Sequence, residues 1–308
     1  MKLFPDGDRI FEVISRYDDL LTLEERDGYE PGDTLALIVP FLVSHDITEK
    51  HITDLSARAS FTGGAQKLVG GLIDDGWKVC CITTTYEQYA LHITNKLGIY
   101  AHNVACTPFP LDKMRQALCK DDLALLRQAE VDILTMRPID DDARIKRGLD
   151  EFFWERLPST GMGELIKQVK PIGGRRKAEA LQRFAEKYNE PPGQWMAVGD
   201  SITDFRMFQL VEGAGGVAVA FNANEYALPY ATIGLASTDI SDLADVLAAW
   251  KKGQRQAVEK MVKSREKAGG QGDRGNFQWL ANKPDIQEAI TLHKGLRQTV
   301  REAAGRLG

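Results

Sequence analysis

The sequence predicts an α/β fold, in which a Rossmann-like parallel sheet carries helical insertions and a helical C-terminal extension. Two observations lead to this class. Short apolar runs at 79–82, 195–198 and 217–220 are bounded by polar or glycine residues, as buried parallel strands are. Longer segments with helical spacing lie between these runs. Their alternation from 77 to 250 favours right-handed strand–helix–strand crossovers.

The composition is that of an ordinary soluble globular protein. The 308 residues are 43% hydrophobic and 27% charged, and the net charge of −5 provides no global basic field for nucleic acid. No apolar run is long enough to cross a bilayer, and no signal peptide is recognisable after Lys2. The cysteines Cys80, Cys81, Cys106 and Cys119 match no zinc spacing. We therefore expect a cytoplasmic protein with reduced cysteines.

The N-terminal region is expected to be largely helical. Apolar residues recur at helical spacing in several segments, and helices are predicted over 9–21, 35–43, 48–55 and 65–74. The strand at 79–82 then ends in the hydroxyls of Thr83, Thr84 and Thr85. A helix over 87–97 follows it and stops at Gly98.

The rest of the chain continues the alternation of strands and helices. Strands are predicted over 99–106, 195–198, 217–220 and 231–236, and helices over much of 111–168, then 175–188, 201–212, 239–251 and 284–303. We expect a helical region at 1–75, an α/β core at 76–250 with a helical insertion at about 110–168, and a helical extension at 251–308. The extension is locally basic from Lys251 to Lys267, which is typical of a solvated helical hairpin and leaves contact with RNA or a protein partner as an alternative.

The central motif follows the apolar run 195–198. Gly199 allows a sharp turn at the end of that strand, and Asp200 and Asp204 come next. Ligands of open α/β sheets bind beyond the carboxyl ends of the strands, and two carboxylates there suit Mg²⁺. The alternative is a helix N-cap at Asp200 or Ser201 with an acidic first turn, which needs no metal.

Other polar residues are expected at the same edge of the sheet. Thr83 ends one strand, and Lys177 begins a helix after the Gly173-Gly174 turn. Together with the two aspartates they supply a hydroxyl donor, a cation and a metal-binding carboxylate, which suit a phosphoryl group. Each has a simpler interpretation, because Thr83 could be a helix N-cap and Lys177 a surface charge.

This arrangement resembles a known family. The order of Thr83, Lys177 and the segment 199–204 resembles the second, third and fourth motifs of the haloacid dehalogenase-like hydrolases, most of which are Mg²⁺-dependent phosphatases. The resemblance covers roughly residues 75–250 and makes the helical regions cap material. It is closest to the subgroup that bears the name energy-converting hydrogenase A subunit R, through the segments 14–19, 32–35, 40–41, 85–89, 173–177 and 221–227.

The resemblance implies a role for each matching residue. Thr83 would hold a phosphate oxygen, and Lys177 would neutralise the nucleophile and the phosphate. Asp200 would bind Mg²⁺, and Asp204 would bind the ion or its water. Thr84, Asn222 and Asn224 are candidates for contacting the substrate, although asparagine also suits turns.

One motif of the family is not found. Its first strand ends in Asp-x-Asp, whose first carboxylate is the nucleophile. The nearest match is Asp6-Gly7-Asp8, but only four residues separate it from Met1, and Pro5 would remove a ladder donor beside it. We interpret the strand as missing by truncation, a misplaced start or genuine loss. Its absence would leave exposed edges on two neighbouring strands, which another segment or a partner chain could cover.

Three functions follow as hypotheses. The first is a phosphohydrolase that acts on a small phosphorylated substrate with Mg²⁺ through an aspartyl-phosphate, provided that an aspartate is supplied. The second is a non-catalytic binding or assembly protein that retains the fold, as a homo-oligomer or with a protein partner. The third is nucleic-acid binding through the basic tail, which the net charge disfavours. The sequence does not identify the substrate.

Overall fold

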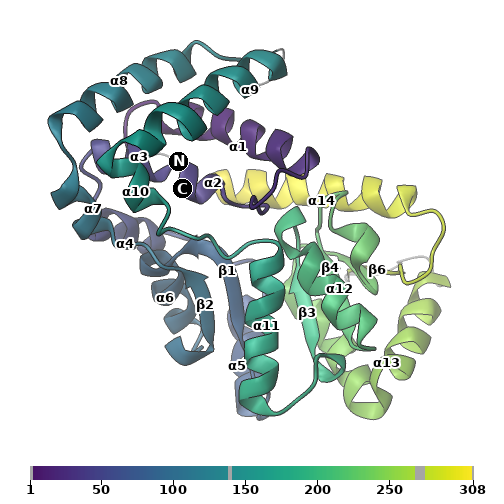
Figure 1. Ribbon diagram of the computed structural model, residues 1–308. Coiled ribbons are helices and arrows are strands. Elements are labelled where there is room, and N and C mark those ends of the chain that lie inside the picture. The colour runs from purple at the N-terminus through teal and green to yellow at the C-terminus, as the bar shows by residue number, and fades with distance from the viewer. Residues whose placement is uncertain (1–2, 138–140, 268–274, 307–308) are drawn as a thin grey trace. The chain divides into compact units, whose positions relative to one another are not determined.

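The structure is a computed structural model that describes residues 3–137, 141–267 and 275–306. The chain divides into two compact units. The first comprises Met1–Ala57, Thr83–Ile93 and Cys106–Gly173, and the second comprises Arg58–Ile82, Thr94–Ala105 and Gly174–Gly308. Residues 58–75, grouped with the N-terminal helical region by the sequence, belong to the second unit. Figure 1 shows the elements of both units, which we describe one at a time.

The first unit is mainly helical. Its helices are α1 (Gly7–Leu23), α2 (Thr34–Leu37), α3 (Val39–Ser44), α4 (Glu49–Ala57), α7 (Leu111–Ala117), α8 (Lys120–Leu134), α9 (Asp142–Asp150) and α10 (Gly161–Ile166). One apolar core holds them together, and α1 contributes Ile10, Ile14, Tyr17 and Leu21 to it at the predicted helical spacing. The apolar segment at 35–43 is buried as predicted, but it forms two short helices that meet at Ile38.

Strand β1 (Cys81–Tyr86) starts and ends later than the predicted strand at 79–82. The three threonines therefore lie within the strand instead of after it. It pairs with β2 (Val104–Thr107), and α6 (Glu87–Lys96) connects the two strands. The boundary between the units passes through both strands. The predicted order of strand, helix and strand is therefore present here, with the threonines in extended backbone.

The second unit contains a mostly parallel sheet. Among the residues that the structure describes, its strands run in the order β3 (Met196–Gly199), β4 (Val217–Phe221), β5 (Ile233–Ala236) and β6 (Asn276–Trp279). Strands β3, β4 and β5 are parallel, with Val198 opposite Val219 and Val219 opposite Ile233. The predicted α/β class with a parallel sheet is confirmed.

Helices cover both faces of this sheet (Figure 1), as the alternation within β4 requires. Ala218 and Ala220 face a core shared with α11 (Arg175–Tyr188), α12 (Phe205–Gly213) and α14 (Gln287–Arg306). Val217, Val219 and Phe221 face a second core, shared mainly with α13 (Leu243–Lys267). Helix α5 (Ala65–Asp74) packs Leu68 against this second core. The small alanines on one face leave room for three helices to approach the strands.

Strand β3 has one partner strand among the described residues, and the loss of a neighbouring strand stays a hypothesis. In the described part of the chain, β3 pairs only with β4, and β1 belongs to a separate two-stranded sheet. A groove of about 660 Å³ lies along the open edge of β3, lined by residues that include Cys80, Cys81, Ile82 and Ala197. Val198 on β3 is 39% exposed, which is unusual for a strand that starts a parallel sheet. This edge has backbone groups available for another strand.

The C-terminal segment departs from the predicted helical hairpin. Strand β6 adds to the sheet antiparallel to β5, with Gln278 opposite Gly234. The segment 269–272, where the sequence showed a glycine-rich interruption, lies outside the described residues. Helix α13 continues to Lys267 with a kink at Gly253 and Gln254. The tail is therefore an integral part of the second unit's core.

The basic side chains of α13 are largely paired with carboxylates of the second unit. The ion pairs are Lys251–Asp75, Arg255–Glu212, Lys263–Glu259 and Arg265–Asp245. These pairs offset the charge of four basic side chains, and contact of the tail with RNA or a protein partner stays an alternative. None of the described helices is long and apolar enough to cross a membrane.

We predict that Gly234→Ala destabilises the second unit. A Cβ atom at this position of β5 would lie 2.6 Å from Oε1 of Gln278 and 2.8 Å from Nε2 of His293, which are both buried. Overpacking of this kind costs about 1–3 kcal/mol, measurable by urea unfolding. Gly295→Ala on α14 is the matched control, because nothing lies within 4 Å of its Cβ position. It should gain up to about 1 kcal/mol of helix stability. Equal effects of the two substitutions would contradict the packing.

Candidate functional site

The site is built on the turn that follows β3, where the sequence placed the two aspartates. Strand β3 ends at Gly199, and Asp200 and Ser201 lead into a single helical turn, Ile202–Asp204, which continues as α12. The carboxylate of Asp204 folds back over this turn. Its Oδ2 atom accepts hydrogen bonds from the backbone N–H groups of Asp200 and Ser201, both at 3.0 Å. The sequence left Asp200 or Ser201 as the helix N-cap, and the structure shows that it is Ser201. The Asp200 side chain is not part of the cap.

Glycine is required at position 199 by this close approach. A Cβ atom there would lie 2.5 Å from Cγ of Asp204 and 2.7 Å from its Oδ2 atom. Any side chain would therefore push the Asp204 carboxylate away from the N–H groups that it accepts from. The sequence motif of a strand, a glycine and two aspartates four residues apart is thus a single packed unit.

Lys177 completes this unit from a different helix. It lies in the first turn of α11, and its Nζ atom donates to Oδ1 of Asp204 at 2.7 Å. Both side chains are buried, with 8% of Lys177 and 5% of Asp204 exposed. A surface position for Lys177, left open by the sequence, is excluded. A buried ammonium group with one carboxylate partner provides a fixed positive charge beside Asp200.

The Gly173-Gly174 turn positions Lys177. Gly173 has no room for a side chain, because a Cβ atom would lie 1.9 Å from the carbonyl oxygen of Pro31 within the first unit. Gly174 has a φ of 50° and precedes the first residue of α11. Its N–H donates to the carbonyl oxygen of Thr203 at 3.0 Å, which ties the start of α11 to the aspartate turn. Gly173 is therefore required by a close backbone contact, and Gly174 by its positive φ.

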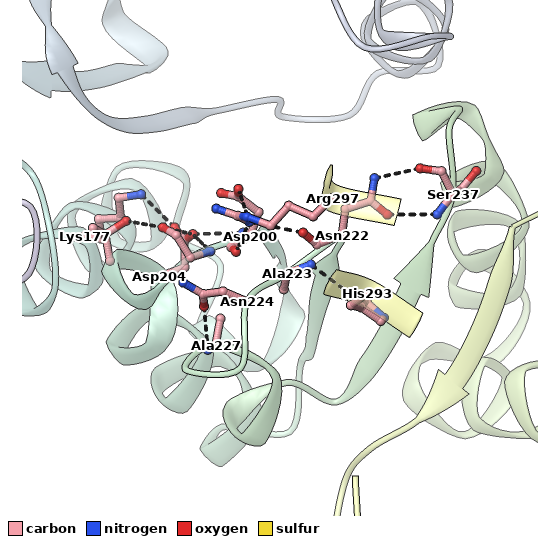
Figure 2. A network of polar contacts seen from close by, with 12 residues as sticks. Lys177, Asp200, Asp204, Asn222, Ala223, Asn224, Ala227, Ser237, His293 and Arg297 are labelled. Atoms are coloured by element: carbon pink, nitrogen blue, oxygen red, sulfur yellow. Dashed lines mark hydrogen bonds and ion pairs between the residues drawn. The ribbon is translucent and has the colours of Figure 1, made fainter. Parts of the chain in front are cut away.

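Asp200 has a partner that the sequence analysis missed. Arg297 of α14 donates from Nη1 to Oδ2 of Asp200 at 2.6 Å, to the Asp200 carbonyl oxygen at 2.6 Å and to the Asn222 carbonyl oxygen at 3.1 Å. Figure 2 shows the arginine side chain extending across the strand ends to reach Asp200. The Asp200 side chain is 54% exposed, whereas that of Arg297 is 15% exposed. Two ion pairs, Lys177–Asp204 and Arg297–Asp200, therefore lie next to each other.

His293 anchors the helix that carries Arg297. Its imidazole is completely buried, Nδ1 accepts from the N–H of Ala223 at 3.0 Å, and Nε2 lies 3.1 Å from Oε1 of Gln278. Burial lowers the pKa of His293 to about 4, so the ring is neutral near pH 7. Residues 289, 293 and 297 face the same side of α14 at intervals of four. The four-residue spacing could have placed these residues on one helix face from the sequence, but no known motif pointed to a function for them.

The two candidate asparagines have structural partners at the end of β4. Asn222 is buried with a φ of 46°, and its amide bonds both the N–H and the carbonyl oxygen of Ser237 at 3.0 and 2.7 Å. Asn224 accepts from the Ala227 N–H at 3.2 Å through its side chain, and its own N–H donates to the Asp200 carbonyl oxygen at 2.9 Å. Figure 2 shows the contacts of Asn222 with Ser237 and of Asn224 with Ala227. These bonds support the alternative that the asparagines form the turns, while substrate contact stays a prediction.

The two candidate threonines lie in β1, in the part that belongs to the first unit. Oγ1 of Thr83 accepts from the Thr85 N–H at 3.3 Å, and Oγ1 of Thr84 donates to the carbonyl oxygen of Ile172 at 3.0 Å. Thr83 thus lies within the strand and not at a helix N-cap, and Thr84 holds the segment that leads to Gly173. Their roles toward a phosphate and a substrate stay predictions.

Asp6, the alternative nucleophile, is not at the end of a strand. Residues 3–6 form turns, and Asp6 is the N-cap residue of α1 with a φ of 55°. Its side chain makes no cap hydrogen bond. The strand context that the family motif requires is therefore missing at this position.

Another buried carboxylate belongs to the first unit. Oδ1 of Asp18 accepts from the Tyr29 hydroxyl at 2.5 Å and from the Thr34 N–H at 3.2 Å. Burial raises the pKa of Asp18 to about 6 in spite of these bonds. Asp18 and Thr34 come from the segments 14–19 and 32–35, which the subgroup resemblance singled out. Their contact shows a structural role, because it fixes the start of α2 against α1.

A magnesium ion suits part of this site. No group of three or more His, Cys, Asp and Glu side chains that could hold a metal occurs in the described ranges. Mg²⁺ keeps several waters and often uses only one or two carboxylates, so a complete protein cage is not required. The half-exposed carboxylate of Asp200 suits direct binding. Asp204 already accepts from two N–H groups and Lys177, which suits contact through a water.

Comparison with known proteins agrees with the fold and motifs. Residues 160–247, which include Lys177 and both aspartates, match the family described as haloacid dehalogenase-like hydrolase. The chain is also similar to the solved structure of gene product AF1437 from Archaeoglobus fulgidus, with 27% sequence identity and a TM-score of 0.81. That likeness covers 97% of this chain and 90% of the other. No curated protein matches the chain.

We predict that Lys177 and Asp204 are strongly coupled in stability. Lys177→Met leaves a buried carboxylate without its cation and should cost about 3–5 kcal/mol, and Asp204→Asn should cost a similar amount. The double variant should lose clearly less than the sum of the two, because it leaves no unpaired charge. Urea unfolding of the four proteins gives the coupling. Additive losses would mean that the pair does not interact as the structure shows.

We also predict that acid destabilises the protein partly through His293. The folded pKa of about 4 lies below the ordinary value of 6.5, so the unfolded chain binds the proton more readily. The stabilisation is complete above pH 6.5 and is lost as the pH falls toward 4, by at most about 3 kcal/mol. His293→Asn should flatten the dependence of the unfolding free energy on pH in this window. Unfolding at pH 8 measures the packing cost of the substitution alone, and an unchanged slope would contradict the assignment.

Proposed function

We propose that the protein is a Mg²⁺-dependent phosphohydrolase that acts on a small phosphorylated substrate. The observation that carries the proposal is the buried Lys177–Asp204 pair beside Asp200 at the carboxyl end of a parallel strand. Ligands of open α/β sheets bind at this end. The match of residues 160–247 to haloacid dehalogenase-like hydrolases supports a hydrolase of that type.

Phosphoryl transfer depends on the charges that surround the transferred group. Bound Mg²⁺ would neutralise phosphate oxygens and polarise the phosphorus centre. Lys177 supplies a second positive charge. Its position is fixed because it lies in the first turn of α11 and pairs with Asp204. Asp204 in turn fixes the backbone of Asp200 and Ser201. The chain's own residues thus orient a phosphate and offset its charge.

The nucleophile is the part of the proposal that needs another segment. Asp204 is committed to hydrogen bonds, and Asp200 is the proposed metal ligand. We propose that a strand docks on the open edge of β3 and brings an aspartate to the carboxyl end of the sheet. The apolar groove at this edge and the exposure of Val198 support it.

The covalent chemistry of this proposal balances in two steps. A carboxylate oxygen of the docked strand would attack the phosphorus, and the bond from phosphorus to the ester oxygen would break as that oxygen takes a proton from water. A water molecule would then attack the phosphorus of the acyl phosphate. The bond from phosphorus to the carboxylate oxygen breaks, which restores the carboxylate and releases inorganic phosphate. Lys177 stabilises negative charge on the phosphoryl group in both steps.

One observation favours a second function, a non-catalytic binding or assembly protein. Both carboxylates of the site are already paired with basic side chains, Asp204 with Lys177 and Asp200 with Arg297. A site that is neutral and closed by its own residues could serve as a structural junction. Hydrolysis separates the two functions, because assembly does not require the chemistry.

We predict Mg²⁺-dependent hydrolysis of phosphate esters that depends on Asp200. A panel that includes p-nitrophenyl phosphate and sugar phosphates should be hydrolysed with EDTA-sensitive rates by the natural protein once a strand that carries the aspartate is docked on β3. Asp200→Asn should lower the rate at least about 100-fold, because a neutral amide binds Mg²⁺ weakly. Asp112→Asn, which removes an exposed carboxylate from the first unit, is the control. Hydrolysis that persists in Asp200→Asn would contradict the proposal, and silence of the whole panel would favour the second function.

A further inference from the structure

The basis for a further inference is the arginine that closes the site. Arg297 comes from α14, 97 residues beyond Asp200 in the chain, and its Nη1 atom contacts oxygens from two strand ends. The Arg297 side chain is 15% exposed, although the carboxylate that it binds is half-exposed. Removing a guanidinium group from water is unfavourable unless its contacts compensate, so the fold commits a charge to this position.

The approach of α14 to the sheet is built by several independent contacts. Ala289 lies in the apolar core of the second unit, and His293 bonds Ala223 and Gln278. Gly234 leaves the space that the His293 ring occupies. One turn after His293, Arg297 is held directly over the end of β3, as Figure 2 shows. Arg297 is therefore positioned by packing and not by its own ion pair alone.

The charges of the site indicate what this position is suited to do. Lys177 and Arg297 carry two positive charges, and Asp200 and Asp204 carry two negative ones, so the four groups sum to zero. A divalent cation at Asp200 would leave a surplus of two positive charges. A phosphate dianion would restore neutrality. Counted over these four groups alone, the charge is balanced either with neither ligand or with both.

We propose that Arg297 is a substrate-binding residue that exchanges its anionic partner. In the state described here it pairs with Asp200. When a divalent cation takes the Asp200 carboxylate, the guanidinium is released from Oδ2 and binds oxygens of the substrate phosphate. The planar guanidinium group matches phosphate geometry and stays charged at all relevant pH values. This inference rests on the proposed function, because it assigns the second cationic contact of the same site.

The exchange has two consequences of opposite sign. Arg297 competes with the cation for Asp200, so its removal should strengthen cation binding. It also supplies hydrogen bonds to the phosphate, so its removal should weaken phosphate binding when the cation is present. A residue with only a structural role would move both affinities in the same direction or neither.

Isothermal titration calorimetry of the full chain tests this, with Mn²⁺ alone and with inorganic phosphate at saturating Mn²⁺. Arg297→Gln should bind Mn²⁺ about tenfold more tightly, because a nearby positive charge is removed. It should bind phosphate roughly 10- to 100-fold more weakly, the value of a charge-assisted contact. Arg297→Lys keeps the charge but loses the guanidinium fork, and it should weaken phosphate binding while changing Mn²⁺ affinity less than Arg297→Gln does.

Lys294→Gln is the matched control, because it removes one positive charge from the same helix. Lys294 pairs with Glu225 and is 54% exposed, so both affinities should change less than about twofold. Circular dichroism melting checks that each variant is folded, and Arg297→Lys serves if Arg297→Gln does not fold. Phosphate affinity of the arginine variants within twofold of the natural protein would overturn the inference. So would a loss of both affinities, or no binding of either probe by the natural protein.

These readouts separate this inference from the proposed function. Opposite shifts in the two affinities support the exchange even if the phosphate esters tested are not hydrolysed. Hydrolysis that depends on Asp200, together with unchanged affinities in Arg297→Gln, would retain the proposed function and overturn the exchange.

Discussion

The buried ion pair between Lys177 and Asp204 is the interaction on which the rest of the site depends. It joins the first turn of α11 to the turn that follows β3, and the same carboxylate accepts from two backbone N–H groups. Gly199 is required because a Cβ atom would collide with that carboxylate. The direction of Asp200 thus follows from a network that reaches three elements. A buried pair of this kind contributes little net stability but fixes geometry, since breaking it leaves an unpaired charge.

A second layer of contacts brings the C-terminal segment to the same place. Strand β6 extends the sheet, and α14 packs across it through Ala289 and His293. Arg297 then reaches the carboxylate that the first network has oriented. The site is therefore formed by residues 174–224 together with a helix that begins at Gln287. The charges of its two ion pairs are balanced within the second unit.

Much of the fold could be predicted from the sequence, because its signals are local. Short apolar runs predicted β3, β4 and β5, and the helical spacing of apolar residues predicted α1. The glycine turn before the basic residues 175–177 predicted the start of α11. Strand β6 was missed because a run of four residues beside a glycine-rich segment has little local signal. Of the site residues, Asp200, Asp204 and Lys177 could be found from one motif order. Arg297 could not, because its role arises only when α14 packs against the sheet, and His293 had no ligand spacing to mark it. The burial of Lys177 and the commitment of the Asn222 amide to Ser237 likewise depend on contacts made in three dimensions.

The central claim is that the turn after β3 is a cation and phosphate site in which Arg297 exchanges the Asp200 carboxylate for the phosphate. A crystal structure determined after soaking with Mn²⁺ and inorganic phosphate, with anomalous data collected for manganese, tests it most directly. The account predicts an anomalous peak at the Asp200 carboxylate, a phosphate beside Lys177, and Arg297 turned from Asp200 toward the phosphate. An Asp200 carboxylate that still binds Arg297, with no manganese beside it, would contradict the account.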